Sequence, residues 1–219
     1  MRSKEIHGTI ENYFETRFHI YPDMFKKITW DSIRKVFKGN KPLRHSLTKL
    51  FHRQINTFVK CFQWNTSKTD MCPLCHLEKE TVQHVLICNQ EDMTKVRNKF
   101  YVTFKTLLTS LKTEPKLQQQ LLHIIQHWTS LQLPLFATDT NDPFEKQVNT
   151  CFHSQACIGW QNFMQGILFC GWMYIQSQYY QQGQFGVEFN ENRWNKKITE
   201  SLIMHYRDMW NERCTIIKV

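Results

Sequence analysis

This chain of 219 residues is 41% hydrophobic and 21% charged, and it has a formal net charge of +9. The apolar share predicts a globular fold and excludes a disordered chain, and the length is sufficient for one sizeable core or two small ones. The most apolar run, residues 166–175, is too short to span a bilayer, so we expect no membrane partner.

Residues 1–65 are predicted to form a basic helical region. We expect one helix over residues 10–19 and another over residues 29–38, where apolar residues recur at helical spacing. A third helix is predicted as a single element over residues 43–62, because six apolar residues fall on one face at about 100° per residue. This apolar stripe consists of Leu47, Leu50, Phe51, Ile55, Phe58 and Phe62.

The net charge of the chain is concentrated in residues 26–60. This segment contains ten basic residues and one acid, Asp31, so its charge of +9 equals that of the whole chain. Lys49, Arg53 and Lys60 fall opposite the apolar stripe. A charged helix face is usually only solvated, but a face of one sign, without acids to pair it, favours phosphate contact. The candidate nucleic-acid-binding residues are Lys35, Lys38, Lys41, Arg44, Lys49, Arg53 and Lys60.

Residues 66–92 contain four metal-type ligands in the pattern C-x2-C-x8-H-x3-C, namely Cys72, Cys75, His84 and Cys88. Two cysteines three positions apart can direct their sulfurs to one point. The histidine and the last cysteine lie one turn apart on a helix, for which Thr81 is the predicted N-cap. Three thiolates and one imidazole form a closed tetrahedral site that suits structural zinc. We therefore predict one structural Zn²⁺ in a small CCHC zinc knuckle between helical parts.

Two other interpretations of these cysteines remain open. Cysteine is often a small buried apolar residue, and Val85, Leu86 and Ile87 could form a core element without any metal. A C-x2-C pair can also be a redox motif, although no thioredoxin-like strand–helix pattern surrounds this one. His76 follows Cys75 directly, so strain makes it a poor ligand, and we expect it to be exposed.

The other five cysteines are scattered among apolar neighbours, at Cys61, Cys151, Cys157, Cys170 and Cys214. This density is below that of a disulfide scaffold, and the first residues lack the apolar core of a secretory signal. We therefore expect an intracellular protein of the nucleus or the cytoplasm.

The rest of the chain is also predicted to be helical, which makes the fold class all-α. A helical hairpin is expected over residues 93–132, followed by a linker over residues 133–150 that contains two prolines. Residues 151–219 form the predicted C-terminal helical region, in which glycines can kink the helices or let them pack closely. The last helix is expected over about residues 191–216.

Three stretches of the chain resemble a known family. The ligand pattern, with Cys72-Pro73-Leu74-Cys75 and Glu80-Thr81, resembles the zinc-binding segment downstream of the polymerase in reverse transcriptases of non-LTR retrotransposons. Residues 158–166 (IGWQNFMQG) and residues 194–213, which end in MWNER, are similar to tail blocks of retroelement-derived proteins. The family commonly has four residues between the histidine and the last cysteine, and this chain has three. The resemblance implies a structural zinc, RNA more than DNA as a ligand, and a retroelement polymerase as a candidate partner.

The sequence lacks the patterns of common catalytic sites. A polymerase or endonuclease needs carboxylates that bind two Mg²⁺ ions, and the palm motif of reverse transcriptases is absent. There is no glycine-rich phosphate loop, no H-E-x-x-H and no nucleophile elbow. No His-x-Glu precedes Cys72, which argues against a deaminase, and a closed zinc site has no position for a reactive water. We expect no enzymatic activity.

These features predict a zinc-stabilised accessory region that binds RNA or DNA through residues 26–60. One alternative is a zinc-stabilised module for protein–protein interaction, with Trp160, Trp172 and Trp210 as interface anchors. Another is a decayed retroelement fragment without a selected activity. Salt-sensitive binding would favour the first hypothesis, and a salt-insensitive complex or dimer would favour the second.

Overall fold

The computed structural model describes residues 2–129, 141–183 and 185–218. Helices and loops make up these ranges, with two isolated β-bridges, so the predicted all-α class is confirmed. None of the helices in these ranges is long and apolar enough to cross a membrane. In chain order the elements are α1 (Arg2–Phe18), α2 (Pro22–Phe25), α3 (Trp30–Gly39), the 3₁₀ helix η1 (Lys41–Leu43), α4 (Arg44–Phe51), α5 (Phe58–Gln63), α6 (Val82–Ile87), α7 (Glu91–Ser110), α8 (Pro115–His127), α9 (Pro143–Ile158), α10 (Trp160–Met164), α11 (Cys170–Gln182) and α12 (Glu191–Ile217).

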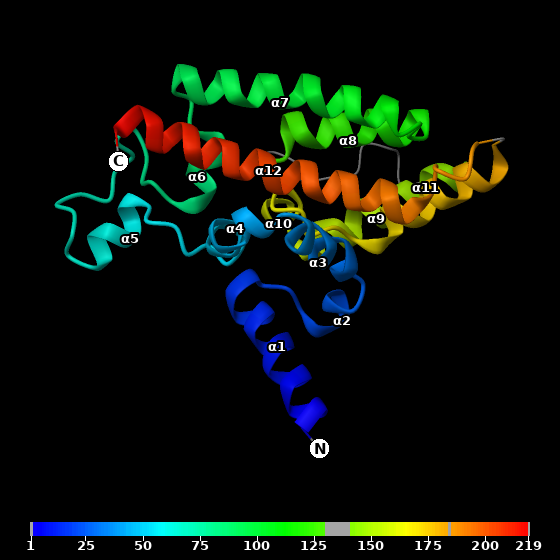
Figure 1. The fold of residues 1–219 in the computed structure, drawn as a ribbon, viewed down its shortest axis with the longest axis horizontal. Helices are drawn as coiled ribbons and strands as arrows, with labels where there is room; N and C mark the ends of the chain where they lie inside the picture. Colours follow the sequence, from blue (N-terminus) through cyan, green and yellow to red (C-terminus); the bar gives the residue numbers. More distant parts are fainter. Residues whose placement is uncertain (1, 130–140, 184, 219) are drawn as a thin grey trace.

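The last helix, α12, is the element around which most of the others pack. It contacts α3, α4, α6, α7, α10 and α11. Figure 1 shows α12 running across the molecule between α7 on one side and α3 with α4 on the other, while α1 projects away from this body. Segments that are far apart in the sequence are therefore joined through one long helix.

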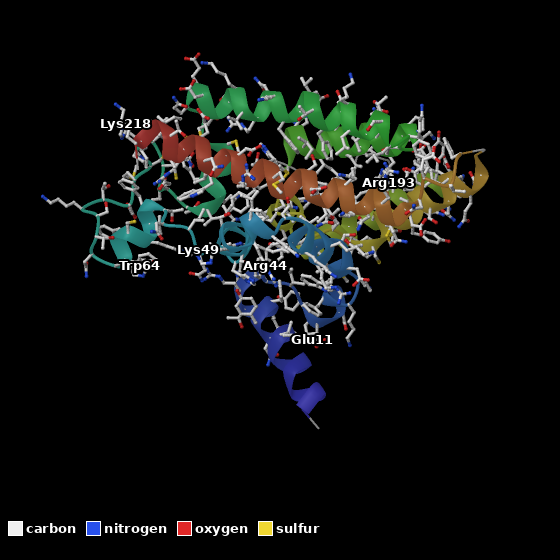
Figure 2. All side chains as sticks on the ribbon, viewed as in Figure 1. Glu11, Arg44, Lys49, Trp64, Arg193 and Lys218 are labelled. Atoms are coloured by element: carbon white, nitrogen blue, oxygen red, sulfur yellow. The ribbon has the colours of Figure 1, made fainter. Side chains whose placement is uncertain are left out.

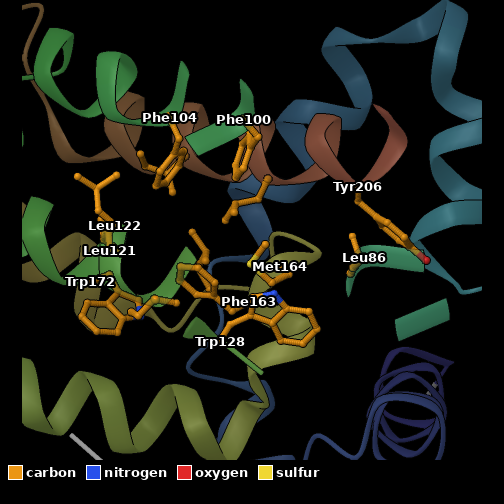
Figure 3. Close-up of a cluster of buried hydrophobic side chains, with 14 of the residues drawn as sticks. Leu86, Phe100, Phe104, Leu121, Leu122, Trp128, Phe163, Met164, Trp172 and Tyr206 are labelled. Carbon is orange, nitrogen blue, oxygen red and sulfur yellow. The ribbon is translucent and has the colours of Figure 1, made fainter. Parts of the chain in front are cut away.

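A single large hydrophobic cluster fills the space between these helices. Phe104 of α7, Leu121 of α8, Trp172 of α11 and Leu202 of α12 are almost fully buried in it. Figure 3 shows Leu121 between the rings of Phe104 and Trp172. Burial of each such side chain contributes about 1.5–3 kcal/mol. Cys72 belongs to the same cluster, which has members from all five predicted segments of the chain.

A second cluster attaches the N-terminal helices to the C-terminal half. Phe14 and Phe18 of α1 stack at a ring-centroid distance of 4.8 Å and pack with Phe51 of α4. The cluster also contains Ile158 and Ile167, which come from the end of α9 and the loop after α10. Helix α1 of the N-terminal region therefore packs against residues that are more than half the length of the chain away in sequence.

Side chains that cap free N–H groups mark the start of several helices. Thr81 accepts a hydrogen bond from the N–H of His84 and begins α6, as predicted. Gln90, Glu114 and Asn190 act in the same way at α7, α8 and α12. Such caps contribute about 1 kcal/mol each and are encoded locally. Helix α12 accordingly covers its predicted range.

The prediction of a single helix over residues 43–62 is wrong. The structure ends α4 at Phe51 and begins α5 at Phe58. Between them Arg53 has a left-handed φ of 54°, which interrupts the helical path. Because the chain turns here, Phe62 does not continue the apolar stripe and is 48% exposed.

The prediction of a linker over residues 133–150 is wrong for its second part. Residues 133–140 lie outside the described part of the chain, but Pro143 begins α9, and the side chain of Asp142 caps this helix. Proline fits the first helical position, where its missing N–H costs no hydrogen bond. The proline that suggested a linker therefore marks a helix start.

Two glycines interrupt the helical run after α9, as the sequence suggested. Gly159 has a φ of 101° and separates α9 from α10, and Gly166 has a φ of 82° in the loop that follows α10. Both values are in the region that favours glycine. A Cβ added at Gly166 would lie 2.8 Å from a side-chain carbon of Ile203, so this glycine also lets the loop approach α12.

Candidate metal centre

The four predicted ligands converge in the structure. Their ligand atoms all lie within 4.8 Å of one another. The Sγ atoms of Cys72 and Cys88 are 3.9 Å apart, and the Sγ of Cys75 is 3.3 Å from the Nε2 of His84. Zn–S bonds near 2.3 Å in a tetrahedral site place ligand atoms about 3.5–3.8 Å apart. The group could therefore hold one metal ion.

A tight turn positions Cys72 and Cys75. The N–H of Cys72 donates to the carbonyl of Glu78, and the N–H of His76 donates to the carbonyl of Cys72. His76 has a left-handed φ of 57°, which closes the turn. Its side chain is exposed, as predicted, so it lies outside the ligand group.

Helix α6 and its C-cap position the other two ligands. His84 and Cys88 are 5% and 1% exposed, and the N–H of Cys88 donates to the carbonyl of His84 over 2.7 Å. Val85 and Leu86 of the same helix belong to the main hydrophobic cluster. Val85 and Leu86 of α6 therefore pack in the core, while His84 of the same helix belongs to the group that could hold a metal ion.

Glu78 is a residue of this site that the sequence analysis missed. Its Oε2 lies 3.1 Å from the Nδ1 of His84, whereas the Nε2 of that ring faces Cys75. A carboxylate at Nδ1 selects the tautomer in which the other nitrogen is free to bind a metal. The sequence showed only an acid in a loop, and nothing in its spacing indicated that it reaches the ring.

The three thiols differ in their affinity for protons. Burial raises the pKa of Cys72 to about 12 and also raises the pKa of Cys88. Burial acts in the same direction at Cys75, but the N–H groups of Leu77 and Glu78 outweigh it and lower its pKa to about 7. Thiols this close cannot all ionise without a cation between them, because like charges oppose one another. A divalent metal ion would supply that charge.

A buried ion pair joins the metal segment to α12. Glu80 is fully buried and Arg213 is 3% exposed, and the Nε and Nη2 of Arg213 each donate to the carboxylate over 2.7 Å. The same carboxylate accepts from the N–H of Phe58 at the start of α5. One acid therefore connects α5, the metal segment and α12.

Each of the three stretches that resemble the retroelement family contributes side chains to buried contacts. Glu80 of the first stretch pairs with Arg213 of the third. Asn162 of the second stretch accepts from the Nη2 of Arg53 over 2.5 Å and donates to the carbonyl of Phe18 over 3.0 Å. These contacts show a structural role for the residues that carry the resemblance.

Most of the candidate nucleic-acid-binding residues are exposed. Figure 2 labels two of them, Arg44 and Lys49, on α4. Within the described ranges, none of the exposed candidates has a carboxylate within ion-pair distance. The exposed candidates are Lys35, Lys38, Lys41, Arg44 and Lys49.

Arg53 differs from the other candidates, because its side chain turns inward. Its guanidinium donates to Asn162 and to Gln165, and it lies 4.8 Å from the centre of the Phe18 ring. Burial lowers the pKa of Arg53. The expectation that Arg53 faces a phosphate backbone is therefore corrected, since the chain leaves the helix at this residue.

Two cations meet at the turn after α4. The Nη2 of Arg17 donates to the carbonyls of His52 and Arg53, both at 3.1 Å, and the ammonium of Lys60 donates to the same Arg53 carbonyl. Burial and the charge of Arg17 lower the pKa of both His52 and Lys60. Residues 32–69 contain no acid. We call Arg17 and Lys60 the cation cluster. Arg17 was not among the predicted binding residues, because it precedes the basic segment in the sequence.

Of the three tryptophans considered as interface anchors, Trp172 is buried, and Trp160 and Trp210 are half-buried. Trp172 is 1% exposed and belongs to the main cluster. Trp160 packs against Phe152 with ring centroids 4.5 Å apart, and the guanidinium of Arg213 lies 4.7 Å from the centre of the Trp210 ring. Trp172 is therefore a core residue, whereas Trp160 and Trp210 each combine a contact within the chain with some exposed surface.

Comparison with known proteins found no family model, no curated protein and no solved structure that matches this chain. The resemblance to the zinc-binding segment of retroelement reverse transcriptases therefore stays a prediction, and the site is interpreted from its own geometry.

Proposed function

We propose that this chain is a zinc-stabilised nucleic-acid-binding protein without catalytic activity. The zinc ion would be bound by the four convergent side chains of the metal centre, Cys72, Cys75, His84 and Cys88. Soft thiolate and imidazole donors suit zinc, and a set of four closes the coordination sphere. The carboxylate of Glu78 at the histidine ring supports this assignment, since ligand histidines commonly have such a partner.

The cation cluster is the observation that supports nucleic-acid binding most strongly. Arg17 and Lys60 donate to one carbonyl oxygen, and no acid of residues 32–69 balances their charge. Cations held together without a counter-ion favour an anion at this place. Arg44 and Lys49 are exposed on the preceding helix, so the positively charged surface is larger than one anion would need. A phosphate backbone, which carries a row of negative charges, would fit such a surface.

Hydrogen bonds link the segment that contains the candidate metal ligands to the basic surface. Glu80 lies in the sequence between the cysteine pair (Cys72 and Cys75) and the pair His84 and Cys88. Its carboxylate accepts a hydrogen bond from the N–H of Phe58, the first residue of α5. Helix α5 in turn positions Lys60 against the turn after α4. Zinc would therefore stabilise the segment that holds one side of the cation cluster. It has no role in chemistry in this proposal.

The salt dependence of binding tests the proposal. A chain with Lys41→Gln, Arg44→Gln and Lys49→Gln loses three exposed charges, so the slope of log affinity against log salt should become shallower by about two to three. The matched control carries Lys99→Gln, Lys105→Gln and Lys146→Gln, which removes three exposed charges from α7 and α9. The control should keep the slope of the unmodified chain. An equal slope in all three chains would contradict the proposal.

The family resemblance adds two finer proposals, namely RNA as the preferred ligand and a retroelement polymerase as a partner. Binding curves for RNA and DNA of the same sequence, measured at one salt concentration, test the first. A tighter complex with DNA would contradict it. Co-purification with a co-expressed retroelement polymerase, lost on removal of the metal, tests the second.

A further inference from the structure

Trp64 is a large aromatic side chain that the fold leaves uncovered. It follows the last residue of α5 and is 54% exposed. Phe62, two residues earlier, is 48% exposed, although the helical pattern assigned it to the core. Exposed rings lose the apolar stabilisation that burial would give them, so a pair of them at one short helix indicates a surface that receives a partner.

The surroundings of Trp64 indicate the chemistry of that partner. The ammonium of Lys60 lies 6.0 Å from the centre of the Trp64 ring and donates to the carbonyl of Arg53 and to the Oε1 of Gln54. Arg17 donates to the same Arg53 carbonyl, so the ring lies next to the cation cluster. Among the described residues, Lys60 and Arg17 have no carboxylate partner, and an aromatic face beside such cations complements a ligand that has both flat rings and phosphates.

The basic surface continues from Trp64 toward α4. The N–H of Gln54 donates to the carbonyl of Lys49 in the last turn of α4, which connects the cation cluster to that helix. Figure 2 shows Trp64, Lys49 and Arg44 in this order from the left of the view toward its middle. The turn after α4 therefore joins the segment that carries Trp64 and Lys60 to the helix that carries Arg44 and Lys49.

We propose that Trp64 is a stacking platform for an unpaired base, and that the ligand is therefore single-stranded nucleic acid. The base would stack on the indole while the adjoining phosphate lies at Lys60 and Arg17. A duplex cannot make this contact, since its bases stack on one another inside the helix. Stacking on aromatic residues combined with a positively charged track is the usual way in which proteins bind single strands. The inference rests on the proposed nucleic-acid binding and makes its ligand more specific.

The test compares a fluorescent single-stranded oligonucleotide with a blunt-ended duplex that contains the same strand, each as RNA and as DNA, titrated with the zinc-loaded full chain. Trp64→Ala should weaken single-strand binding by about 5- to 100-fold, the range observed for loss of one stacking contact. Duplex affinity should change by less than about twofold, because the bases of the duplex are already stacked on one another. Trp64→Phe keeps an aromatic face and should retain most of the single-strand affinity.

A matched control is Tyr174→Ala on α11, because Tyr174 is 59% exposed and lies outside the basic segment. It should leave both affinities unchanged. Circular dichroism and zinc content should be the same in all variants, since both residues are mostly solvent-facing.

The outcomes separate this inference from the proposed function. If the unmodified chain binds neither oligonucleotide, nucleic-acid binding itself fails and the inference fails with it. If the chain binds both and Trp64→Ala changes neither affinity, or changes both equally, the proposed function stands and the stacking platform is overturned. If in addition the unmodified chain self-associates and Trp64→Ala is monomeric, the exposed ring is a protein interface instead.

Discussion

The carboxylate of Glu78 contacts the metal centre through a single ring nitrogen, the Nδ1 of His84. Glu78→Gln keeps the length of the side chain but removes the charge that orients the imidazole. We expect zinc affinity to fall by about 10- to 100-fold, the usual effect of losing such a partner. Competition for zinc with a chromophoric chelator measures the zinc affinity of each variant. Lys79→Gln is the matched control, because the neighbouring Lys79 pairs with Asp70 and contacts no ligand. Equal affinities in the two variants would contradict this role.

Arg213 is the residue whose loss should most damage the link between the metal segment and α12. Arg213→Met leaves the carboxylate of Glu80 buried without its cation, and breaking such a pair costs about 3–5 kcal/mol of unfolding free energy. Glu80→Gln combined with Arg213→Met should recover part of this loss, because no uncompensated charge remains. Urea unfolding of the two chains measures both values. A cost below about 1 kcal/mol for Arg213→Met, as for an exposed pair, would show that the pair does not hold the fold.

At the scale of elements, the loop after α10 depends on Gly166. Gly166→Ala places a Cβ at 2.8 Å from Ile203 of α12 and at a φ of 82° that other residues rarely adopt. We expect a loss of more than about 1 kcal/mol in unfolding free energy. Gly39→Ala, at the end of α3, meets no atom within 4 Å and should stay within about 0.5 kcal/mol of the unmodified chain. Thermal unfolding measures the midpoints of the two variants. Equal midpoints would show that the loop at Gly166 does not approach α12 closely.

Helix positions could largely be predicted from the sequence because their signals are local. Thr81 caps α6, and apolar periodicity located α3 and α12. The break between α4 and α5 was not predicted: it falls at Arg53, whose side chain donates to Asn162, 109 residues away, and such a distant contact leaves no local pattern in the sequence. Helical periodicity cannot distinguish one long helix from two short ones separated by a turn of suitable length.

The candidate site shows the same division between local and distant signals. The spacing of Cys72, Cys75, His84 and Cys88 was sufficient to predict that they converge, because a turn and one helical turn determine it. The cation cluster could not be predicted, since Arg17 arrives from α1 through tertiary packing. The distribution of charges along the sequence identifies a basic segment, but only the three-dimensional structure shows which cations lie close together.

At the scale of the whole molecule, His205 makes the fold sensitive to acid. Its ring stacks on Phe100 at 3.9 Å between centroids, and burial, together with the charge of Arg97, lowers its pKa to about 3. The unfolded chain has the ordinary value near 6.5 and binds the proton first. Stability should therefore fall as the pH decreases from about 6.5 toward about 3.

The variant His205→Phe tests this, because it keeps a ring against Phe100 and removes the titrating nitrogen. Its urea midpoint should fall less than that of the unmodified chain between about pH 7.5 and about pH 5.5. The exposed His45, changed to Gln, is the matched control and should follow the unmodified chain. Any acid-induced loss of metal is common to all three chains. Identical decreases in all of them would show that His205 does not control the response.

The most direct test of the central claim, a structural zinc held by Cys72, Cys75, His84 and Cys88, is the metal content of the purified chain combined with unfolding in the presence of a chelator. We predict about one zinc per chain, a loss of zinc in Cys72→Ser and Cys88→Ser, and a lower unfolding midpoint after chelation, since ligand binding to the folded state alone stabilises it. Cys157→Ser, which replaces an exposed cysteine outside the group, should retain the zinc. A chain that contains no zinc and unfolds at the same midpoint with and without chelator would contradict the account.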